Sequence, residues 1–105
     1  MTATPPCSSL RVRQATRADL LEVFRIEQTV FPQPWAYRTF EGFLGRQGFL
    51  VGEVDKQVVG YIVADTIPNH GRPLWHITDF AVHPDRQGEG IGATLLERAL
   101  SILNG

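Results

Sequence analysis

The stretch "RQGEGIG", residues 86–92, decides how the rest of the chain is interpreted. Three glycines fall within five positions, a density that would destabilise the interior of an ordinary helix or strand. The apolar segment "LWHITDFAV" at 74–82 precedes the stretch, and the amphipathic segment "ATLLERALSIL" at 93–103 follows it. The glycine stretch is therefore predicted to be a loop that leads from a strand into a helix.

Further strands are predicted on the N-terminal side of this loop. The segment "LRVRQA" at 10–15 alternates apolar and polar residues, as a half-buried strand does. The segments "FLVGEV" at 49–54 and "VVGYIVAD" at 58–65 are rich in β-branched and aromatic residues and predict an antiparallel hairpin. The segment "IPNHGRP" at 67–73 predicts a loop before the strand at 74–82.

Two helices are predicted between the first and second strands. Thr16, followed three residues later by Asp19, has the spacing of a capping box, so a helix is expected to begin there. Glu27 falls on the apolar face of this helix, which is made by Leu20, Val23, Phe24 and Val30. The prolines of "FPQPW" at 31–35 end it. The second, shorter helix has its apolar positions at Ala36, Tyr37, Phe40, Phe43 and Leu44. The complete order, strand, helix, helix, strand, strand, strand, helix, predicts an α+β domain.

The composition excludes several classes of protein. The chain has 105 residues and is 43% apolar, which suits one domain with a modest core. Ten Lys and Arg residues against eleven Asp and Glu residues give a net charge of −1 without a block of like charge. This balance argues against a nucleic-acid partner and against an anionic membrane surface. The sequence also contains no apolar run long enough for a membrane span.

The N-terminal segment "MTATPPCSS" at 1–9 lacks the basic start and apolar core of a secretory signal. It is expected to be a disordered tail before a domain at residues 10–105. Cys7 is the single cysteine and cannot form an internal disulfide. His70 and His83 lie in predicted loops and, with one distant cysteine, make no recognisable metal site. These features predict a cytoplasmic protein without a metal cofactor.

The glycine loop is suited to holding an anion. Unpaired N–H groups at a helix N-terminus carry about half a positive charge. Glycine allows positive φ angles and lets a phosphate approach without meeting a Cβ atom. From the glycines alone, a turn that only redirects the chain is an equally good interpretation.

Two families of phosphate-binding loop fit the spacing poorly. A Walker loop is excluded because the corresponding residues, 92–94, read Gly-Ala-Thr and lack its lysine. A dinucleotide-binding turn fits Gly88, Gly90 and Ala93 only weakly, because Gly88 lies six positions after Val82 and that turn should follow its strand almost at once.

A third pattern fits closely. Residues 87–92, "QGEGIG", match Q/R-x-x-G-x-G/A and resemble the acetyl-CoA pyrophosphate loop of the GNAT acetyltransferase superfamily. The segments at 80–92 and 93–100 are similar to that superfamily's fourth strand and third helix. The segment "RIEQTVFPQPWAYRTF" at 25–40 resembles the substrate-side helix and loop of RimI-type and archaeal protein N-terminal acetyltransferases. The segment at 49–65 resembles their second and third strands.

This resemblance implies a GNAT-like mixed, mainly antiparallel sheet. It also implies a cytoplasmic enzyme that transfers an acetyl group from acetyl-CoA to the N-terminal α-amine of a protein, with ribosomal proteins among the candidate acceptors. By the family pattern, the pyrophosphate is held by the backbone amides of Gln87, Gly88, Glu89, Gly90, Ile91 and Gly92. The strand edge that would pair with the pantetheine arm is formed by Phe80, Ala81 and Val82. The peptide entrance would be lined by Glu27, Phe31 and Trp35.

Two residues are candidate catalysts. His76 matches the position of a histidine in some archaeal N-terminal acetyltransferases, which implies that it takes the proton of the amine directly or through water. The alternative is a histidine packed on a strand. Glu27 is expected to face the substrate cleft, because a charge within an apolar stripe is costly unless it is paired. Its alternative is a helix-edge carboxylate bonded to water or arginine. Asp79 is polar in an otherwise apolar strand, so it either bonds loop backbone or faces a cleft, and the structural role is favoured. Tyr61 and Trp75 are interpreted as core or rim aromatics.

The family fold includes further elements after the predicted final helix: a fifth strand, a helix carrying a tyrosine that protonates the leaving thiolate, and a final hairpin. We therefore expect the N-terminal portion of a longer acetyltransferase, or a short form, truncated before the C-terminal strands. The alternative is a non-catalytic acyl-CoA-binding module that self-associates as a homodimer through the exposed edge of the strand ending at Val82. A dinucleotide-binding domain is a distant third interpretation.

Overall fold

The computed structural model describes residues 9–104, so the expected tail at 1–9 lies, except for Ser9, outside the described residues. The chain follows the predicted order of strands and helices. The elements are β1 (Arg11–Gln14), the 3-10 helix η2 (Arg17–Asp19), α1 (Leu20–Val30), α2 (Tyr37–Glu41), β2 (Phe49–Val54), β3 (Gln57–Asn69), β4 (Arg72–Val82), the 3-10 helix η3 (Pro84–Arg86) and α3 (Ile91–Asn104). Within the described part of the chain, no helix has the length and apolar character needed to cross a membrane.

The four strands form one antiparallel sheet in the order β1-β2-β3-β4. Tight turns join β2 to β3 and β3 to β4, as antiparallel pairing allows, whereas β1 connects to β2 through α1 and α2. The expected antiparallel sheet is therefore confirmed. A doubly wound dinucleotide-binding fold requires a mostly parallel sheet, so that interpretation is wrong.

A β-bulge interrupts the pairing of β3 with β4. Val63 pairs with Asp79 and Ala64 pairs with Ile77, which leaves Thr78 without a partner in the register. A bulge changes the direction in which neighbouring side chains point. In the described sheet β4 is an edge strand, so one row of its N–H and C=O groups faces away from β3.

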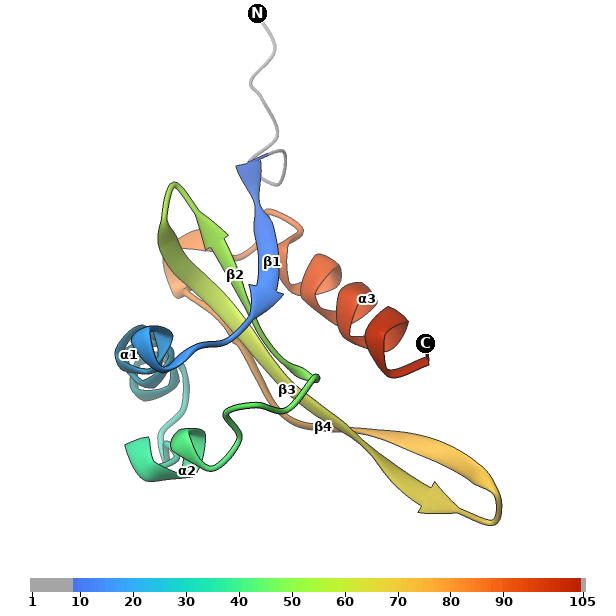
Figure 1. Ribbon diagram of the computed structural model, residues 1–105. Helices are drawn as coiled ribbons and strands as arrows, with labels where there is room; N and C mark the ends of the chain where they lie inside the picture. Colours follow the sequence, from blue (N-terminus) through green and yellow to red (C-terminus); the bar gives the residue numbers. More distant parts are fainter. Residues whose placement is uncertain (1–8, 105) are drawn as a thin grey trace, which may run out of the picture.

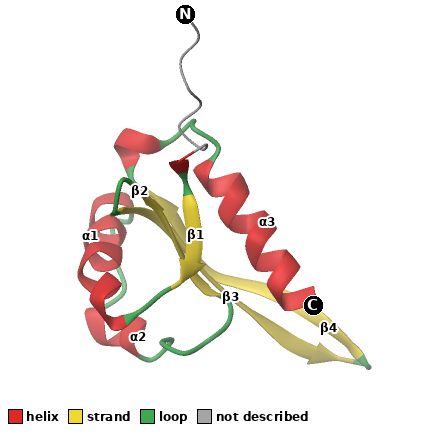
Figure 2. Cartoon of the chain, turned by 45° about the horizontal axis from the view of Figure 1, so that its top comes forward, coloured by secondary structure: helices red, strands yellow, loops and turns green. Residues whose placement is uncertain are grey.

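Helices cover both faces of the sheet. Figures 1 and 2 show α1 and α2 on one face and α3 on the other. Strand residues alternate between the two faces, and each face has its own buried cluster. The cluster under α1 and α2 contains Ala15, Leu20, Val23, Ile26, Phe40, Phe49, Val51, Tyr61, Val63 and Ala81. The cluster under α3 contains Leu50, Val54, Val59, Ile62, Ala64, Ile91, Leu95 and Ala99.

The helix α3 packs closely on the sheet because a glycine lies beneath it. A Cβ atom on Gly60 of β3 would lie 3.2 Å from Leu95 Cδ1 and 3.1 Å from the carbonyl oxygen of Ala81. The buried positions Ile91, Leu95 and Ala99 recur every four residues, as the predicted amphipathic pattern requires. The close approach fixes the start of α3, and with it the glycine loop, against β3 and β4.

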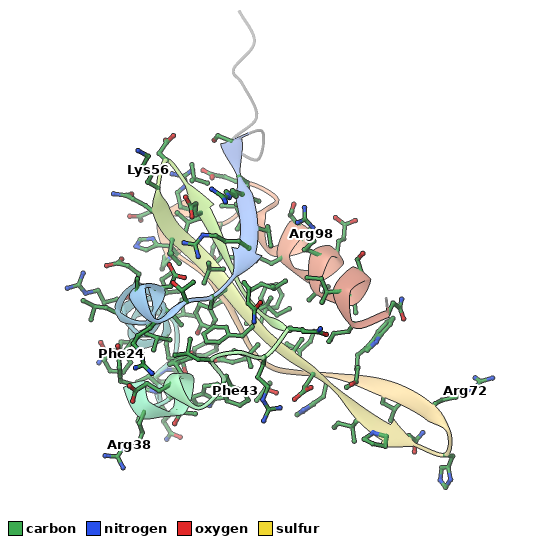
Figure 3. The ribbon with its side chains drawn as sticks, viewed as in Figure 1. Phe24, Arg38, Phe43, Lys56, Arg72 and Arg98 are labelled. Atoms are coloured by element: carbon green, nitrogen blue, oxygen red, sulfur yellow. The ribbon has the colours of Figure 1, made fainter. Side chains whose placement is uncertain are left out.

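The loop predicted at 67–73 is wrong. β3 continues to Asn69 and β4 begins at Arg72, so only His70 and Gly71 form the turn, both with positive φ. Beyond the bulge, the two strands keep an unbroken antiparallel register from the pair Ala64 and Ile77 to the pair Asn69 and Arg72, which the prolines within the segment do not prevent. The resulting hairpin projects from the body of the molecule, and Figure 3 shows Arg72 near its tip.

The start of the first helix differs in detail from the prediction. Thr16 and Asp19 make the expected capping contacts, since the Thr16 N–H and hydroxyl both donate to Asp19 Oδ2, at 2.7 and 3.0 Å. They begin the 3-10 turn η2, however, and α1 starts only at Leu20. Arg13 also donates to both oxygens of Asp19, at 2.7 and 2.8 Å, which anchors this turn to β1 and lowers the pKa of Asp19.

The second helix is shorter than predicted. It ends at Glu41, and the chain continues through turns that include Gly42 and Gly45, the latter at a φ of +88°. Positive φ at Gly45 cannot occur inside a helix, so the expected apolar positions Phe43 and Leu44 lie in turns rather than on a helical face. Both still pack against the cluster beneath α1 and α2.

Candidate active site

An apolar groove lies along β4, between this strand and the C-terminal end of α1. Its volume is about 310 Å³, and we call it the β4 groove. It is lined by Val30, Phe31, Phe80, Ala81, Val82 and Gln87. The structure thus brings together the three residues predicted to flank a pantetheine arm, one residue of the predicted peptide entrance, and the first residue of the predicted pyrophosphate loop.

The glycine loop continues from the end of this groove. Gly88 and Gly90 have φ angles of +83° and +84°, a conformation that suits glycine and few other residues. A Cβ atom at either position would meet no protein atom within 4 Å. The side of the loop on which these residues lie is therefore open to a ligand.

The loop holds its shape through its own side chains. Gln87 Nε2 donates to the carbonyl of Val82 at 3.1 Å, which ties the loop back to the end of β4. Arg86 Nε donates to Glu89 Oε1 at 2.9 Å. The N–H and hydroxyl of Thr94 both donate to the carbonyl of Gly90, at 3.1 and 3.0 Å, and so close the first turn of α3. Glu89 is thereby engaged with arginine, and its backbone remains available to a ligand.

The loop presents backbone amides at the N-terminus of α3. Ile91 and Gly92, predicted as loop residues, form the first turn of that helix. The Ile91 side chain is buried in the cluster beneath α3, so only its backbone is available to a ligand. A Cβ atom on Gly92 would lie 3.3 Å from Phe80 Cζ, which shows how closely this turn packs beside the β4 groove. The first-turn N–H groups and the helix dipole favour an anion here.

Glu27 on α1, Tyr61 on β3 and Asp79 on β4 meet beside the groove without lining it, and we call them the acid cluster. Glu27 on α1 is 2% exposed, and its Oε1 accepts a hydrogen bond from the Tyr61 hydroxyl. Glu27 Oε2 accepts the backbone N–H of Trp35 at 2.8 Å. The Tyr61 hydroxyl lies 3.3 Å from Asp79 Oδ2. The alternative placement of Glu27 at a helix edge, bonded to water or arginine, is wrong.

The environment of the acid cluster shifts its proton affinities. Burial, followed by the hydrogen bond and negative charge of Glu27, raises the pKa of Asp79 to about 7. Burial and the same two carboxyls raise the pKa of Tyr61 above its ordinary value, so the phenol stays protonated. A carboxyl that titrates near neutral pH can accept a proton from an amine under physiological conditions.

Of the residues predicted to line the peptide entrance, Phe31 lines the β4 groove and Trp35 packs away from it. Trp35 is half-buried and stacks on Phe43, with 5.5 Å between ring centroids and 13° between ring planes. Figure 3 shows Phe43 on the side of the sheet that carries α1 and α2. Trp35 is therefore fixed by packing, and its amide orients Glu27.

His76 lies outside the acid cluster. Its side chain is exposed, and it pairs with Asp65 on the far side of the bulge from Asp79. Alternation along β3 places it on the same face of the sheet as Asp79. His76 is thus an exposed residue of β4, and both its catalytic role and the alternative of a histidine packed on a strand stay predictions.

Tyr61 and Asp79 are the polar contacts that sequence reasoning missed. Asp79 is an isolated carboxylate in an otherwise apolar strand, which was a usable signal, but its partner Glu27 is 52 positions earlier. Of the residues that the structure describes, no three His, Cys, Asp or Glu side chains gather so as to hold a metal ion.

The chain is similar in sequence to known N-acetyltransferases. The chain is 34% identical over 88 residues to an uncharacterized N-acetyltransferase of Methanocaldococcus jannaschii, a match that covers 82% of this chain and 54% of that protein. It is 28% identical to an N-alpha-acetyltransferase of Sulfolobus acidocaldarius, with 89% and 61% covered. The chain thus spans roughly half to two thirds of the length of these relatives.

Solved structures share the fold. Ard1 from Thermoplasma volcanium superposes with a TM-score of 0.80 at 26% identity, over 91% of this chain and 64% of that chain. A GNAT family acetyltransferase from Brucella melitensis, in complex with acetyl-CoA, gives 0.70 at 26% identity, over 91% and 69%. A family model described as "Acetyltransferase (GNAT) family" matches residues 16–105. The chain belongs to the GNAT family of acetyltransferases.

Proposed function

We propose that this chain carries the acetyl-CoA site of an enzyme that acetylates the N-terminal α-amine of proteins. The observation that carries the proposal is the continuity of the site. The β4 groove, the glycine loop at one end and the acid cluster at the other follow one another along β4 and α1. The pantetheine arm would occupy the β4 groove, the pyrophosphate would bind the glycine loop, and the acceptor amine would lie at the acid cluster.

Each part suits its portion of the reactants. The groove is largely apolar and flanks an edge strand, so an extended pantetheine arm can pair with the free edge of β4 near Phe80, Ala81 and Val82. The N–H groups of residues 87–92 suit the pyrophosphate. Acetyl-CoA would supply the activated acetyl group, and this chain's residues would orient it and accept the proton of the acceptor.

An α-amine is the acceptor that this site favours. Deprotonating an α-amine at pH 7 costs only about 1–1.4 kcal/mol, whereas a lysine side chain costs roughly 4.6 kcal/mol. The acid cluster offers a weak base of matching strength in Asp79. The N-alpha-acetyltransferase among the relatives supports the same acceptor. Ribosomal proteins remain candidate acceptors under this proposal.

Mass spectrometry of peptides tests the acceptor. Each peptide is offered with acetyl-CoA in two forms, one with a free N-terminus and one with a blocked N-terminus and a free internal lysine. We expect acetylation at the free α-amine and little at lysine. Acetylation confined to lysine would contradict the α-amine assignment, and binding of acetyl-CoA without any transfer would favour the non-catalytic module.

His76→Ala is expected to slow acetyl transfer about tenfold and to leave acetyl-CoA affinity unchanged. The side chain is exposed on the acid-cluster face but does not line the β4 groove. A group that passes a proton onward contributes less than the 10²–10⁴-fold typical of direct proton transfer. Steady-state rates and calorimetric affinities of the two proteins check this, and a variant with full turnover would remove His76 from the mechanism.

A further inference from the structure

The acid cluster contains two carboxyls bridged by one phenol. Tyr61 has a single hydroxyl proton, which it donates to Glu27. Its second contact, at 3.3 Å to Asp79 Oδ2, is then a hydrogen bond only when Asp79 carries a proton. The acid cluster is therefore best satisfied when it holds two protons, one on the Tyr61 phenol and one on the pair of carboxyls.

Among the described residues, the groups in contact with Asp79 are neutral or acidic, and His76, on the same face of the sheet, lies across the bulge from it. On its own strand, the Phe80 N–H donates to Asp79 Oδ1 at 2.9 Å. From β3 it meets Tyr61, and from α1 it meets the carboxyl of Glu27. No Arg, Lys or His among the described residues is a cause of its shifted pKa. Burial and the second carboxyl both favour the protonated form, which is the expected result when two carboxyls share one site.

Asp79 is also placed to meet the acceptor amine. It lies two positions before Ala81 and on the same face of β4, and Ala81 lines the β4 groove, while Glu27 lies one helical turn before Val30 and Phe31 on α1 and the residue after it. Glu27 is 2% exposed, whereas Asp79 is only half-buried. Asp79 is therefore the most exposed member of the acid cluster and the one that a molecule extending past Ala81 would meet first.

We propose that Asp79 is the catalytic residue that takes the proton of the incoming α-amine, and that Glu27 and Tyr61 are positioning residues that share this proton with it. The inference rests on the proposed function and deepens it. It assigns to Asp79 a role that its sequence context left as structural.

The acetyl-transfer step conserves protons and electrons. The Asp79 carboxylate takes one proton from the α-ammonium group, which leaves a neutral amine. The amine nitrogen attacks the thioester carbonyl of acetyl-CoA, so that a C–N bond forms, the C–S bond breaks and its electron pair goes to sulfur. The second amine proton ends on that sulfur as the CoA thiol, and the proton on Asp79 passes to water on the face that carries His76.

Carbon-13 NMR of the Asp and Glu carboxyls tests the shared proton without any need for activity. In the wild-type chain we expect the Asp79 carboxyl to titrate near pH 7. Asp79→Asn should remove that titration, and Glu27→Gln should lower its midpoint by at least one pH unit. Asp85→Asn is the control, because the Asp85 side chain is 87% exposed and its loss should leave the titration unchanged.

Acetyl transfer tests the catalytic role. Asp79→Asn should lower kcat for an α-amine peptide about 10²-fold at pH 7, with KM for acetyl-CoA unchanged, and the loss should shrink at pH 9, where the amine is already neutral. Asp85→Asn should match the wild type. A wild-type chain that transfers no acetyl group at any pH would overturn both the proposed function and the role of Asp79. If transfer occurs, an Asp79→Asn profile that superposes on the wild type, or the absence of a carboxyl titrating near pH 7, overturns only the role of Asp79.

Discussion

Gly90→Val is expected to abolish acetyl-CoA binding, with affinity reduced by at least about 10²-fold, equivalent to roughly 2.7 kcal/mol. Gly90 has a φ of +84°, which a β-branched residue adopts only at a cost of about 1–3 kcal/mol. A side chain at this position meets no protein atom within 4 Å, so it would project into the space assigned to the pyrophosphate. The substitution thus either moves the loop or fills the ligand site.

Gly45→Val is the matched control for this prediction. Gly45 has a nearly identical φ of +88° and an equally open surrounding, but it lies in the turn between α2 and β2, away from the glycine loop. The Gly45→Val substitution imposes the same backbone strain, yet calorimetry should show that this variant binds acetyl-CoA about as tightly as the wild type. Normal binding by Gly90→Val would show that the loop assignment is wrong, and equal loss in both variants would point to a global effect of strain.

Glu27→Ala is expected to destabilise the fold by about 3 kcal/mol. The substitution leaves the Trp35 N–H without an acceptor and takes from the Tyr61 hydroxyl its buried partner. An unsatisfied buried polar group costs about 1–3 kcal/mol, and two groups are affected here. Urea denaturation of the wild type and the variant measures the difference.

Two further variants separate this effect from a general loss of charge on α1. Glu22 lies on the same helix, and its side chain is 49% exposed and paired with Arg25. Glu22→Ala should therefore lower the free energy of unfolding by no more than about 0.5 kcal/mol. Glu27→Gln keeps an acceptor for Trp35 and should cost less than Glu27→Ala. Equal stability of Glu27→Ala and Glu22→Ala would show that the hydrogen bonds of Glu27 do not hold α1 and the following loop together.

The sequence predicted the elements that depend on local signals. The glycines at 88, 90 and 92 permit backbone conformations that other residues avoid, and the prolines at 32 and 34 fix φ and remove N–H donors, so the loop and the end of α1 could be located from these residues alone. The alternation of apolar residues predicted the strands for the same reason. The family resemblance, resting on these local patterns, predicted five of the six residues that line the β4 groove, the exception being Val30.

The features that depend on distant contacts could not be predicted in this way. The hairpin at residues 67–73 has the composition of a loop but forms strands, because pairing with β4 outweighs the local propensity. The bond between Tyr61 and Glu27 joins residues 34 positions apart, and Asp79 enters the acid cluster only through the register of β3 and β4. An aromatic in a strand and an isolated acid are each ordinary alone, and only their juxtaposition indicates proton transfer.

The central claim is that the β4 groove and the glycine loop together form an acetyl-CoA site. Isothermal titration calorimetry of the 105-residue chain with acetyl-CoA, using NAD as the control ligand, tests it most directly. Saturable binding of acetyl-CoA and no binding of NAD is the predicted result. Failure to bind acetyl-CoA, or equal binding of both ligands, would contradict the claim.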